Sequence, residues 1–122
     1  MEPVLIPTLS LDMKKKRIRI HKQTLRLLDN PGYIQLLVNP EQKTIAIKVC
    51  NASAQQVHKI LYKPSVECDL YSKELMYQLN TVCPELISGY TYRLFGKLLP
   101  EKGVALFQMT ELFPVAEFSG KQ

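Results

Sequence analysis

The sequence lacks several features that would assign it to a protein class at once. Its 122 residues include no tryptophan, only five glycines and only three cysteines. The glycines exclude a collagen-like chain and never approach the spacing of a dinucleotide or nucleoside-triphosphate loop. Cys50, Cys68 and Cys83 are an odd number without a close pair, which argues against a disulfide framework or a zinc knuckle. We therefore expect free, reduced thiols.

Long apolar runs are also missing. None approaches the roughly 20 residues that a membrane-spanning helix needs. Residues 1–12 contain Glu2 and no basic residue, and Pro3 and Pro7 interrupt their apolar stretch, so they do not resemble a signal peptide. We expect a cytoplasmic protein with no membrane partner.

What is present fits one globular domain, 1–122. The chain is 46% hydrophobic and 22% charged, a composition too apolar for a disordered protein. A chain of this length buries roughly two-thirds of its unfolded surface, so it can fold without disulfides or metals.

The formal net charge of +5 is unevenly distributed. Residues 1–62 contain ten Lys or Arg and four acidic residues, whereas residues 63–122 contain six and seven. Most of the excess lies in a short basic run consisting of Lys14, Lys15, Lys16, Arg17, Arg19, Lys22 and Arg26. Such a run suits nucleic acid, an anionic membrane, an acidic protein, or simply a solvated surface.

Hydrophobic periodicity predicts the elements of the first half. Residues 1–13 are expected to form an apolar, extended arm packed on a neighbour. Residues 17–20 alternate polar and apolar side chains, as a half-buried strand does. A short helix is predicted over 25–28, followed by a hairpin of Tyr33–Val38 and Thr44–Val49, whose turn contains Pro40.

The second half gives a similar succession of elements. Residues 52–61 fit either a helix or a strand, and the spacing of their apolar side chains favours a short helix. The remaining predicted elements are a strand over Val66–Leu70, a helix with Ser72 as its N-cap and Cys83-Pro84 at its end, and a hairpin of Tyr90–Leu99 and Val104–Leu112 that turns at Gly103.

The two halves suggest an internal repeat. Residues 14–50 and 66–112 each run strand, short helix, hairpin, and Pro40-Glu41 in the first hairpin turn corresponds to Pro100-Glu101 in the second. A unit of about 35 residues buries too little apolar surface to fold alone. We therefore predict an α+β fold in which two strand–helix–β-hairpin units pack as a pseudo-dimer within one chain.

This order resembles the swapped-hairpin DNA-binding domains of the AbrB, MazE and MraZ families. The likeness is carried by Arg17-Ile18-Arg19-Ile20 as first strand, Leu25-Arg26-Leu27-Leu28 as short helix and Tyr33–Val49 as hairpin, about a third of the chain. The chain departs from those families at His21, where they usually have proline, and at Asp29-Asn30, where they favour glycine.

The resemblance implies a swapped-hairpin-like β-barrel that binds duplex DNA, as a small transcriptional regulator does. The basic strand and helix would then contact phosphates, and arginines would be able to contact guanine edges. Because only one half is basic, a homodimer would be needed to present two binding faces. The DNA-binding residues implied are Lys14, Lys15, Lys16, Arg17, Arg19, Lys22 and Arg26.

Catalytic signals are weak. His21 and His58 are isolated in sequence from acids and cysteines, and Cys83 is expected to be a buried, inert thiol. Glu67 and Asp69 share a strand face, which is compatible with a metal or an acid–base pair but lacks a third ligand nearby. We predict no enzyme activity, no catalytic residue, no metal and no cofactor.

The alternative function is a non-enzymatic protein-interaction module. The apolar arm, Val4–Ile6 and Leu9–Leu11, would add a strand to another subunit's sheet edge. The tyrosines of the second half would form a binding surface, although Tyr90 and Tyr92, two apart on one strand, are better explained by packing within the sheet. The basic run would then serve solubility alone.

Overall fold

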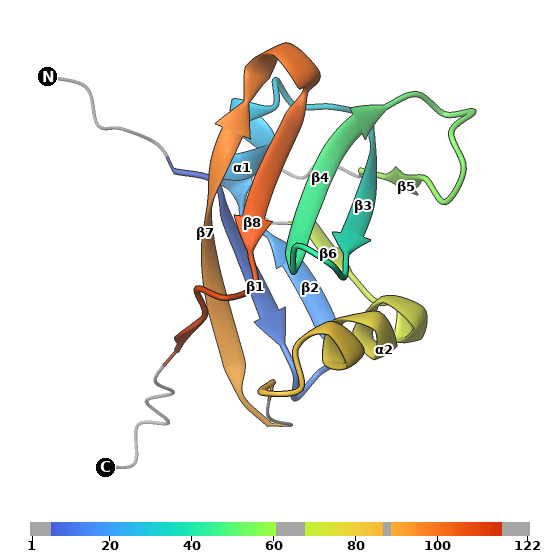
Figure 1. Ribbon diagram of the computed structural model, residues 1–122. Helices are drawn as coiled ribbons and strands as arrows, with labels where there is room; N and C mark the ends of the chain where they lie inside the picture. The colour runs from blue at the N-terminus through green and yellow to red at the C-terminus, as the bar shows by residue number, and fades with distance from the viewer. Residues whose placement is uncertain (1–5, 61–67, 87–88, 116–122) are drawn as a thin grey trace, which may run out of the picture.

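The computed structural model describes residues 6–60, 68–86 and 89–115. They form one antiparallel sheet that curls into a half-barrel, with one helix near each end (Figure 1). The strands are β1 (Thr8–Asp12), β2 (Arg17–Ile20), β3 (Tyr33–Asn39), β4 (Thr44–Cys50), β5 (His58–Lys59), β6 (Cys68–Leu70), β7 (Thr91–Leu99), β8 (Val104–Gln108) and β9 (Phe113–Pro114). The helices are α1 (Lys22–Leu27), α2 (Lys73–Val82) and the 3₁₀ turn η1 (Pro100–Lys102).

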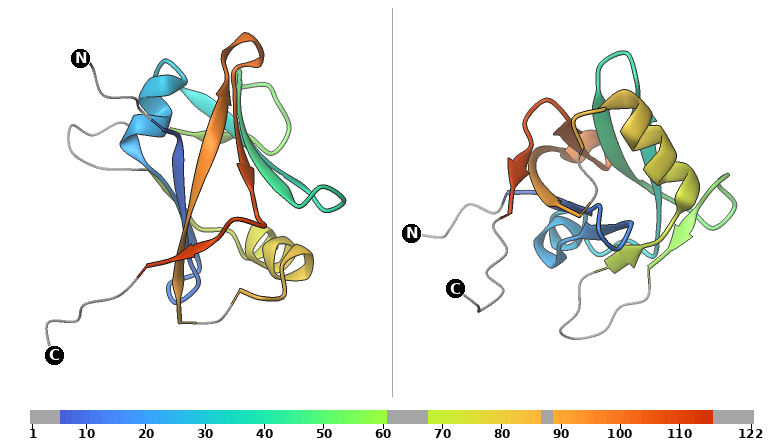
Figure 2. Two further views of the ribbon diagram at one scale, coloured as in Figure 1. Left: turned by 60° about the vertical axis from the view of Figure 1, so that its left-hand side comes forward. Right: turned by 90° about the horizontal axis from the view of Figure 1, so that it is seen from below.

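The strands follow the order β5-β3-β4-β8-β7-β1-β2-β6. The short strand β9 is not part of this order and pairs with β7. β7 holds the two parts of the sheet together, because its first half pairs with β1 and its second half with β8. The change of partner occurs between Phe95 and Gly96. Figure 2 shows the resulting curl, with α1 and α2 at opposite ends.

Alternating side chains place the core on the inner face of the curl. Leu9 and Leu11 of β1 and Leu94 of β7 are fully buried there, together with Phe107 of β8. α2 begins where the Ser72 hydroxyl accepts a hydrogen bond from the Leu75 N–H (3.2 Å), the N-cap expected from the sequence. No helix in the described ranges has the length and apolar character required to span a membrane.

The predicted α+β pseudo-dimer of two strand–helix–β-hairpin units is wrong. Strand accounts for 44% and helix for only 19% of the structure, and the strands make one curled half-barrel. The physical reason is β1, which the repeat did not include. β1 lies between β2 and β7, whereas β6, the counterpart of β2 in the second half, is an edge strand with β2 as its partner. The two halves are therefore not equivalent.

Several individual elements were predicted correctly, although their assembly was not. Both predicted hairpins form, as β3–β4 and β7–β8, and Gly103 adopts the positive φ of 62° expected in the second turn. The short helix favoured over 52–61 is wrong, because turns and the two-residue strand β5 occupy residues 51–59. The predicted strand at Val66 begins outside the described residues and is β6 within them.

The predicted N-terminal arm is an integral part of the sheet from residue 8 onward. Leu9–Leu11 pair with β2 on one side and with β7 on the other, so they have no free edge to offer another subunit. The start of β1 is fixed by Thr24 of α1, whose fully buried hydroxyl accepts from the Thr8 N–H (2.7 Å) and donates to the Thr8 carbonyl (2.8 Å). Residues 1–5 lie outside the described ranges.

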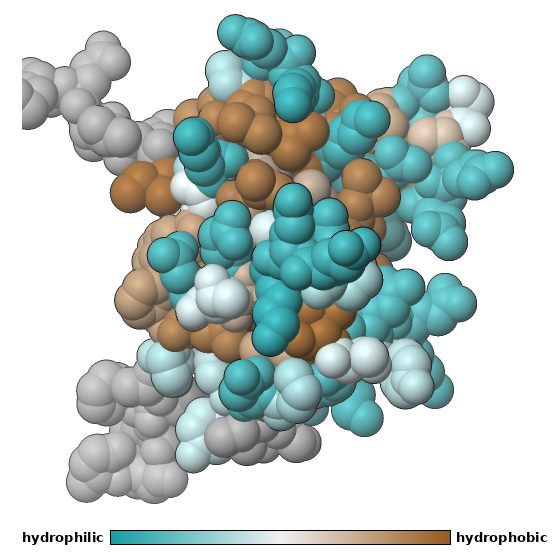
Figure 3. Space-filling model, in the orientation of Figure 1, coloured by the Kyte–Doolittle hydropathy of each residue, from teal (hydrophilic) through white to brown (hydrophobic). Residues whose placement is uncertain are grey.

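Hydrophobic side chains are also exposed on the outside of the sheet. Phe95 of β7 and Phe113 of β9 lie with their ring centroids 5.6 Å apart. Figure 3 shows hydrophobic surface along the β7 margin of the molecule. The exposed large hydrophobic residues in the described ranges are Ile6, Leu37, Tyr71, Tyr77, Tyr90, Phe95 and Phe113.

Candidate anion-binding pocket

Polar side chains line the outer face of the sheet where β7, β1 and β2 run side by side. Strand periodicity requires this, because Leu9 and Leu11 point into the core and Ser10 and Asp12 therefore point outward. The strand register places Ser10 between Arg19 of β2 and Arg93 of β7. It also places Asp12 between Arg17 and Thr91.

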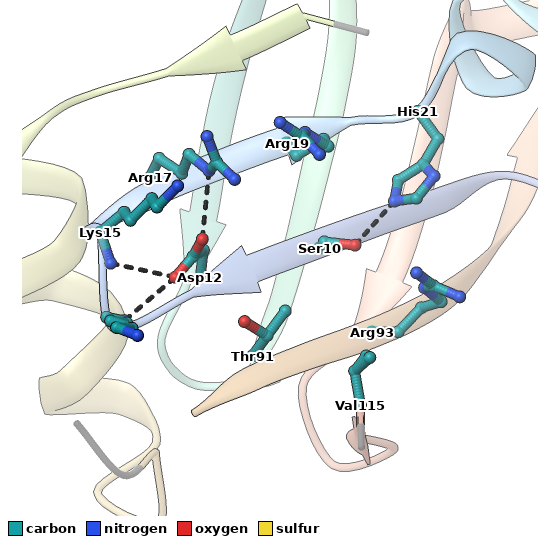
Figure 4. A pocket seen from close by; sticks show the side chains of 10 residues that line it. Ser10, Asp12, Lys15, Arg17, Arg19, His21, Thr91, Arg93 and Val115 are labelled. Carbon is teal, nitrogen blue, oxygen red and sulfur yellow. Dashed lines mark hydrogen bonds and ion pairs between the residues drawn. The ribbon is translucent and has the colours of Figure 1, made fainter. Parts of the chain in front are cut away.

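These side chains enclose a pocket of about 370 Å³, which we call the basic pocket (Figure 4). Five of its lining residues are cationic, and they come from three parts of the chain: the β1–β2 turn, β2 and β7. The lining residues are Ser10, Asp12, Lys14, Lys15, Arg17, Arg19, His21, Thr91, Arg93 and Val115.

Asp12 organises the turn that carries the lysines. Its Oδ1 accepts hydrogen bonds from the backbone N–H groups of Lys14 (3.1 Å) and Lys15 (3.0 Å). Its Oδ2 accepts from Nε of Arg17 at 3.1 Å, and both side chains are largely buried. Asp12 is therefore occupied by three donors and fixes the turn, while the side chain of Lys15 projects from it (Figure 4).

Asp69 of β6 holds the second arginine. Its two oxygens accept from Nε (2.7 Å) and Nη2 (3.0 Å) of Arg19, a bidentate pair, and Nη1 of Arg17 lies 3.4 Å away. The hydrogen bonds from Arg19 hold the pKa of Asp69 below its ordinary value. A hydrogen bond with Tyr71 raises the pKa of Arg17. Both arginines are thus cations engaged by carboxylates of the same chain.

The structure divides the seven residues of the predicted DNA-binding set. Lys14, Lys15, Arg17 and Arg19 line the basic pocket together. Lys16 lines a different cavity, about 530 Å³, beside Lys73 and Tyr77 of α2. The remaining two members belong to α1, Lys22 half-buried and Arg26 exposed, and they do not line the basic pocket.

Arg93 is the functional candidate that the sequence did not reveal. Its Nε is buried and has no hydrogen-bond partner among the described residues. The only available signal was its position between the buried residues Tyr92 and Leu94, which sets its side chain on the outer face. Its neighbour Ser10 is more than 80 positions away in the sequence. A local sequence pattern does not predict strand pairing between residues so far apart.

The other candidate groups have ordinary structural surroundings. His21 Nε2 lies 2.6 Å from Oγ of Ser10 inside the basic pocket. Burial raises the pKa of the Cys68 and Cys83 thiols, so both stay protonated near neutral pH, and Cys83 Sγ donates to Oε1 of Glu85 at 3.2 Å. Burial lowers the pKa of His58. Within the described ranges, no three His, Cys, Asp or Glu side chains are grouped as metal ligands, and Glu67 lies outside those ranges.

Comparison with known proteins adds no assignment. No protein-family model matches the sequence, and neither a curated protein nor a solved structure is significantly similar to it. The case for a function therefore depends on the geometry and charge of the basic pocket.

Proposed function

We propose that the protein binds duplex DNA through phosphate contacts made by the β1–β2 turn and the basic pocket, as a small transcriptional regulator does. The observation that carries the proposal is the convergence of Lys14, Lys15 and Arg93 beside two paired arginines in one pocket. Five cationic residues against Asp12 and Asp69 leave three formal positive charges in and around this pocket. Such a concentration of charge attracts a polyanion.

The contacts are divided between the two kinds of cation. Lys14, Lys15 and Lys16 are exposed, and none forms an ion pair with a described residue. They supply the phosphate contacts. Arg19 donates two hydrogen bonds from its guanidinium to Asp69. Arg19 could therefore contact a guanine edge in the same way only if this bidentate pair with Asp69 were broken. Phosphate contact alone gives affinity with little sequence preference.

We include a homodimer in the proposal, since the described residues of one chain form this basic site once. A cytoplasmic location, expected from the sequence, is also part of the proposal. Binding to another protein is the alternative, and the absence of DNA binding would favour it.

The direct test is the titration of a labelled duplex with the wild type and with a variant in which Lys14, Lys15 and Lys16 are replaced by alanine. At about 50 mM salt we expect roughly tenfold or more weaker binding by the variant, because the phosphate contacts and the counterions they release are lost. Arg17 and Arg19 are unsuitable for this test, because their removal leaves Asp69 without its partners and disturbs the sheet.

The matched control replaces Lys48, Lys97 and Lys102, three exposed lysines of β4, β7 and η1 that do not line the basic pocket. This variant loses the same charge, and its affinity should stay within about twofold of the wild type. Equal weakening by both variants would show attraction by net charge alone and would refute the proposed site. No binding by the wild type would refute the function.

A further inference from the structure

The basic pocket contains a buried donor that has no acceptor among the described residues. Arg93 lies on β7 directly opposite Ser10 of β1, and its backbone pairs on the other side with Phe113 of β9. Arg93 therefore has a strand on each side, and Nε of its guanidinium is buried and makes no hydrogen bond with a described residue. Because an unsatisfied buried donor destabilises a fold, such an atom indicates a place where an acceptor binds.

The pocket that Arg93 lines also contains donors suited to a tetrahedral oxyanion. Hydroxyls of Ser10 and Thr91 lie on the same sheet face, Ser10 being 5% exposed, and both line the pocket. Lys14 and Lys15 stand at the end of the pocket formed by the β1–β2 turn. Neutral hydroxyls, a guanidinium and ammonium groups are the donors that phosphate oxygens accept from in proteins.

The charge of the pocket selects the kind of oxyanion. Asp12 and Asp69 offset two of the five cations, which leaves more positive charge than one carboxylate or one phosphodiester would neutralise. A phosphate monoester carries a charge near −2 at neutral pH. At about 370 Å³ the pocket is near the lower limit of small-ligand sites, large enough for a phosphate and a sugar and too small for a base-paired segment.

We propose that the basic pocket binds a phosphate monoester, with Arg93 as the residue that receives it. The proposal deepens the DNA-binding function and rests on it, since it assigns the pocket to one terminal phosphate while the turn lysines contact the backbone. The same chemical group occurs at a phosphorylated 5′ end and in a free mononucleotide, and the experiment below distinguishes these sources.

The first measurement is the melting temperature in inorganic phosphate and in sodium chloride of the same ionic strength. A ligand that binds only the folded state stabilises it, so phosphate at about ten times its Kd should raise the melting temperature of the wild type by roughly 5 °C. Arg93→Met removes the buried donor and one charge, so this variant should melt higher than the wild type in chloride. It should gain nothing from phosphate.

Two further variants make the result specific to Arg93. Arg93→Lys retains the charge without Nε, and we expect it to bind phosphate about tenfold more weakly than the wild type. Lys97→Met changes an exposed cation on the same strand, outside the pocket, and should respond to phosphate as the wild type does. A wild type that phosphate stabilises no more than chloride overturns the inference, and so does an Arg93→Met variant that phosphate still stabilises fully.

The source of the phosphate is then tested with two duplexes and one mononucleotide. A duplex bearing a 5′-phosphate should bind at least tenfold more tightly than the same duplex with a 5′-hydroxyl if the site serves nucleic-acid ends. A mononucleotide that binds as tightly as the phosphorylated duplex identifies the free nucleotide as the ligand. Duplex binding that persists without any phosphate stabilisation defeats the pocket inference alone. Phosphate stabilisation without duplex binding defeats the proposed function alone.

Discussion

Asp69 accepts from two nitrogens of Arg19 and lies 3.4 Å from Nη1 of Arg17, so one residue of β6 restrains both arginines of β2. The hydrogen bonds from Arg19 lower the pKa of Asp69 in the folded protein. A carboxyl with a lowered folded pKa stabilises the fold above its unfolded pKa, about 3.9. That contribution is lost as the pH falls through the folded pKa.

Asp69→Asn should therefore be destabilised at neutral pH and indistinguishable from the wild type in strong acid. The expected loss near pH 7 is about 1 kcal/mol, since the Arg19 side chain is 34% exposed and water screens the pair. Urea unfolding between pH 7 and pH 2 measures the difference. Asp29→Asn removes the same charge at an exposed turn position and serves as the control. A difference from the wild type that stays constant as the pH falls below 4 would contradict the assigned role of Asp69.

Single residues also show how far the sequence could be interpreted. The alternation of Arg17 and Arg19 with isoleucines placed them correctly on one strand face, and the lysine run before them is exposed. Their partner Asp69 is some 50 positions away, and the opposite charges were visible without any indication that they meet. The basic run was therefore counted as available charge, although its arginines are paired.

At the scale of elements, β7 is the strand on which the sheet depends. It pairs with β1 through Phe95 and with β8 from Gly96 onward. A Cβ on Gly96 would lie 2.6 Å from the backbone oxygen of Leu106 and 2.6 Å from the buried ring of Phe107. Neither group has room to move, so glycine is needed there for space, although its φ is not positive.

We therefore expect Gly96→Ala to lower the free energy of unfolding by about 3 kcal/mol, the upper part of the range for overpacked sites. Gly32→Ala is the matched control, because a Cβ there meets nothing within 4 Å, and its effect should be within about 0.5 kcal/mol. Chemical denaturation of both variants measures the comparison. Equal effects of the two substitutions would show that position 96 tolerates a side chain.

Elements defined by local signals were predictable, and elements defined by distant partners were not. The hairpins have turn residues between apolar runs, and Asn39 accepts from the Glu41 N–H (3.0 Å) as such a turn requires. β1 shows the alternation of Leu9, Ser10, Leu11 and Asp12 but follows Pro7, which suggested an arm. In the sheet Pro7 is accommodated because it contributes only its carbonyl, which accepts from the Gly96 N–H at 2.8 Å.

For the whole molecule, the decisive feature is that the basic pocket is built on one part of the curled sheet. The β7–β1–β2 part carries it, while β3, β4 and β5 contribute no lining residue. Among the described residues, no strand pairs with β6 as β1 pairs with β2, so the strand arrangement that carries the basic pocket occurs once. A single chain therefore offers one such contact to a duplex, and a symmetric contact requires two chains.

The dependence of duplex affinity on salt concentration shows how many chains bind one duplex. The logarithm of the affinity falls with the logarithm of salt concentration by about 0.9 per phosphate contacted. Replacing Lys14, Lys15 and Lys16 by alanine should therefore reduce this slope by about 3 if one chain binds and by about 5 if two bind. We expect the larger change, together with a sedimentation mass of two chains on one duplex. A reduction near 3 with a mass of one chain would exclude the homodimer and leave the phosphate contacts in place, whereas an unchanged slope would remove the turn lysines from the interface.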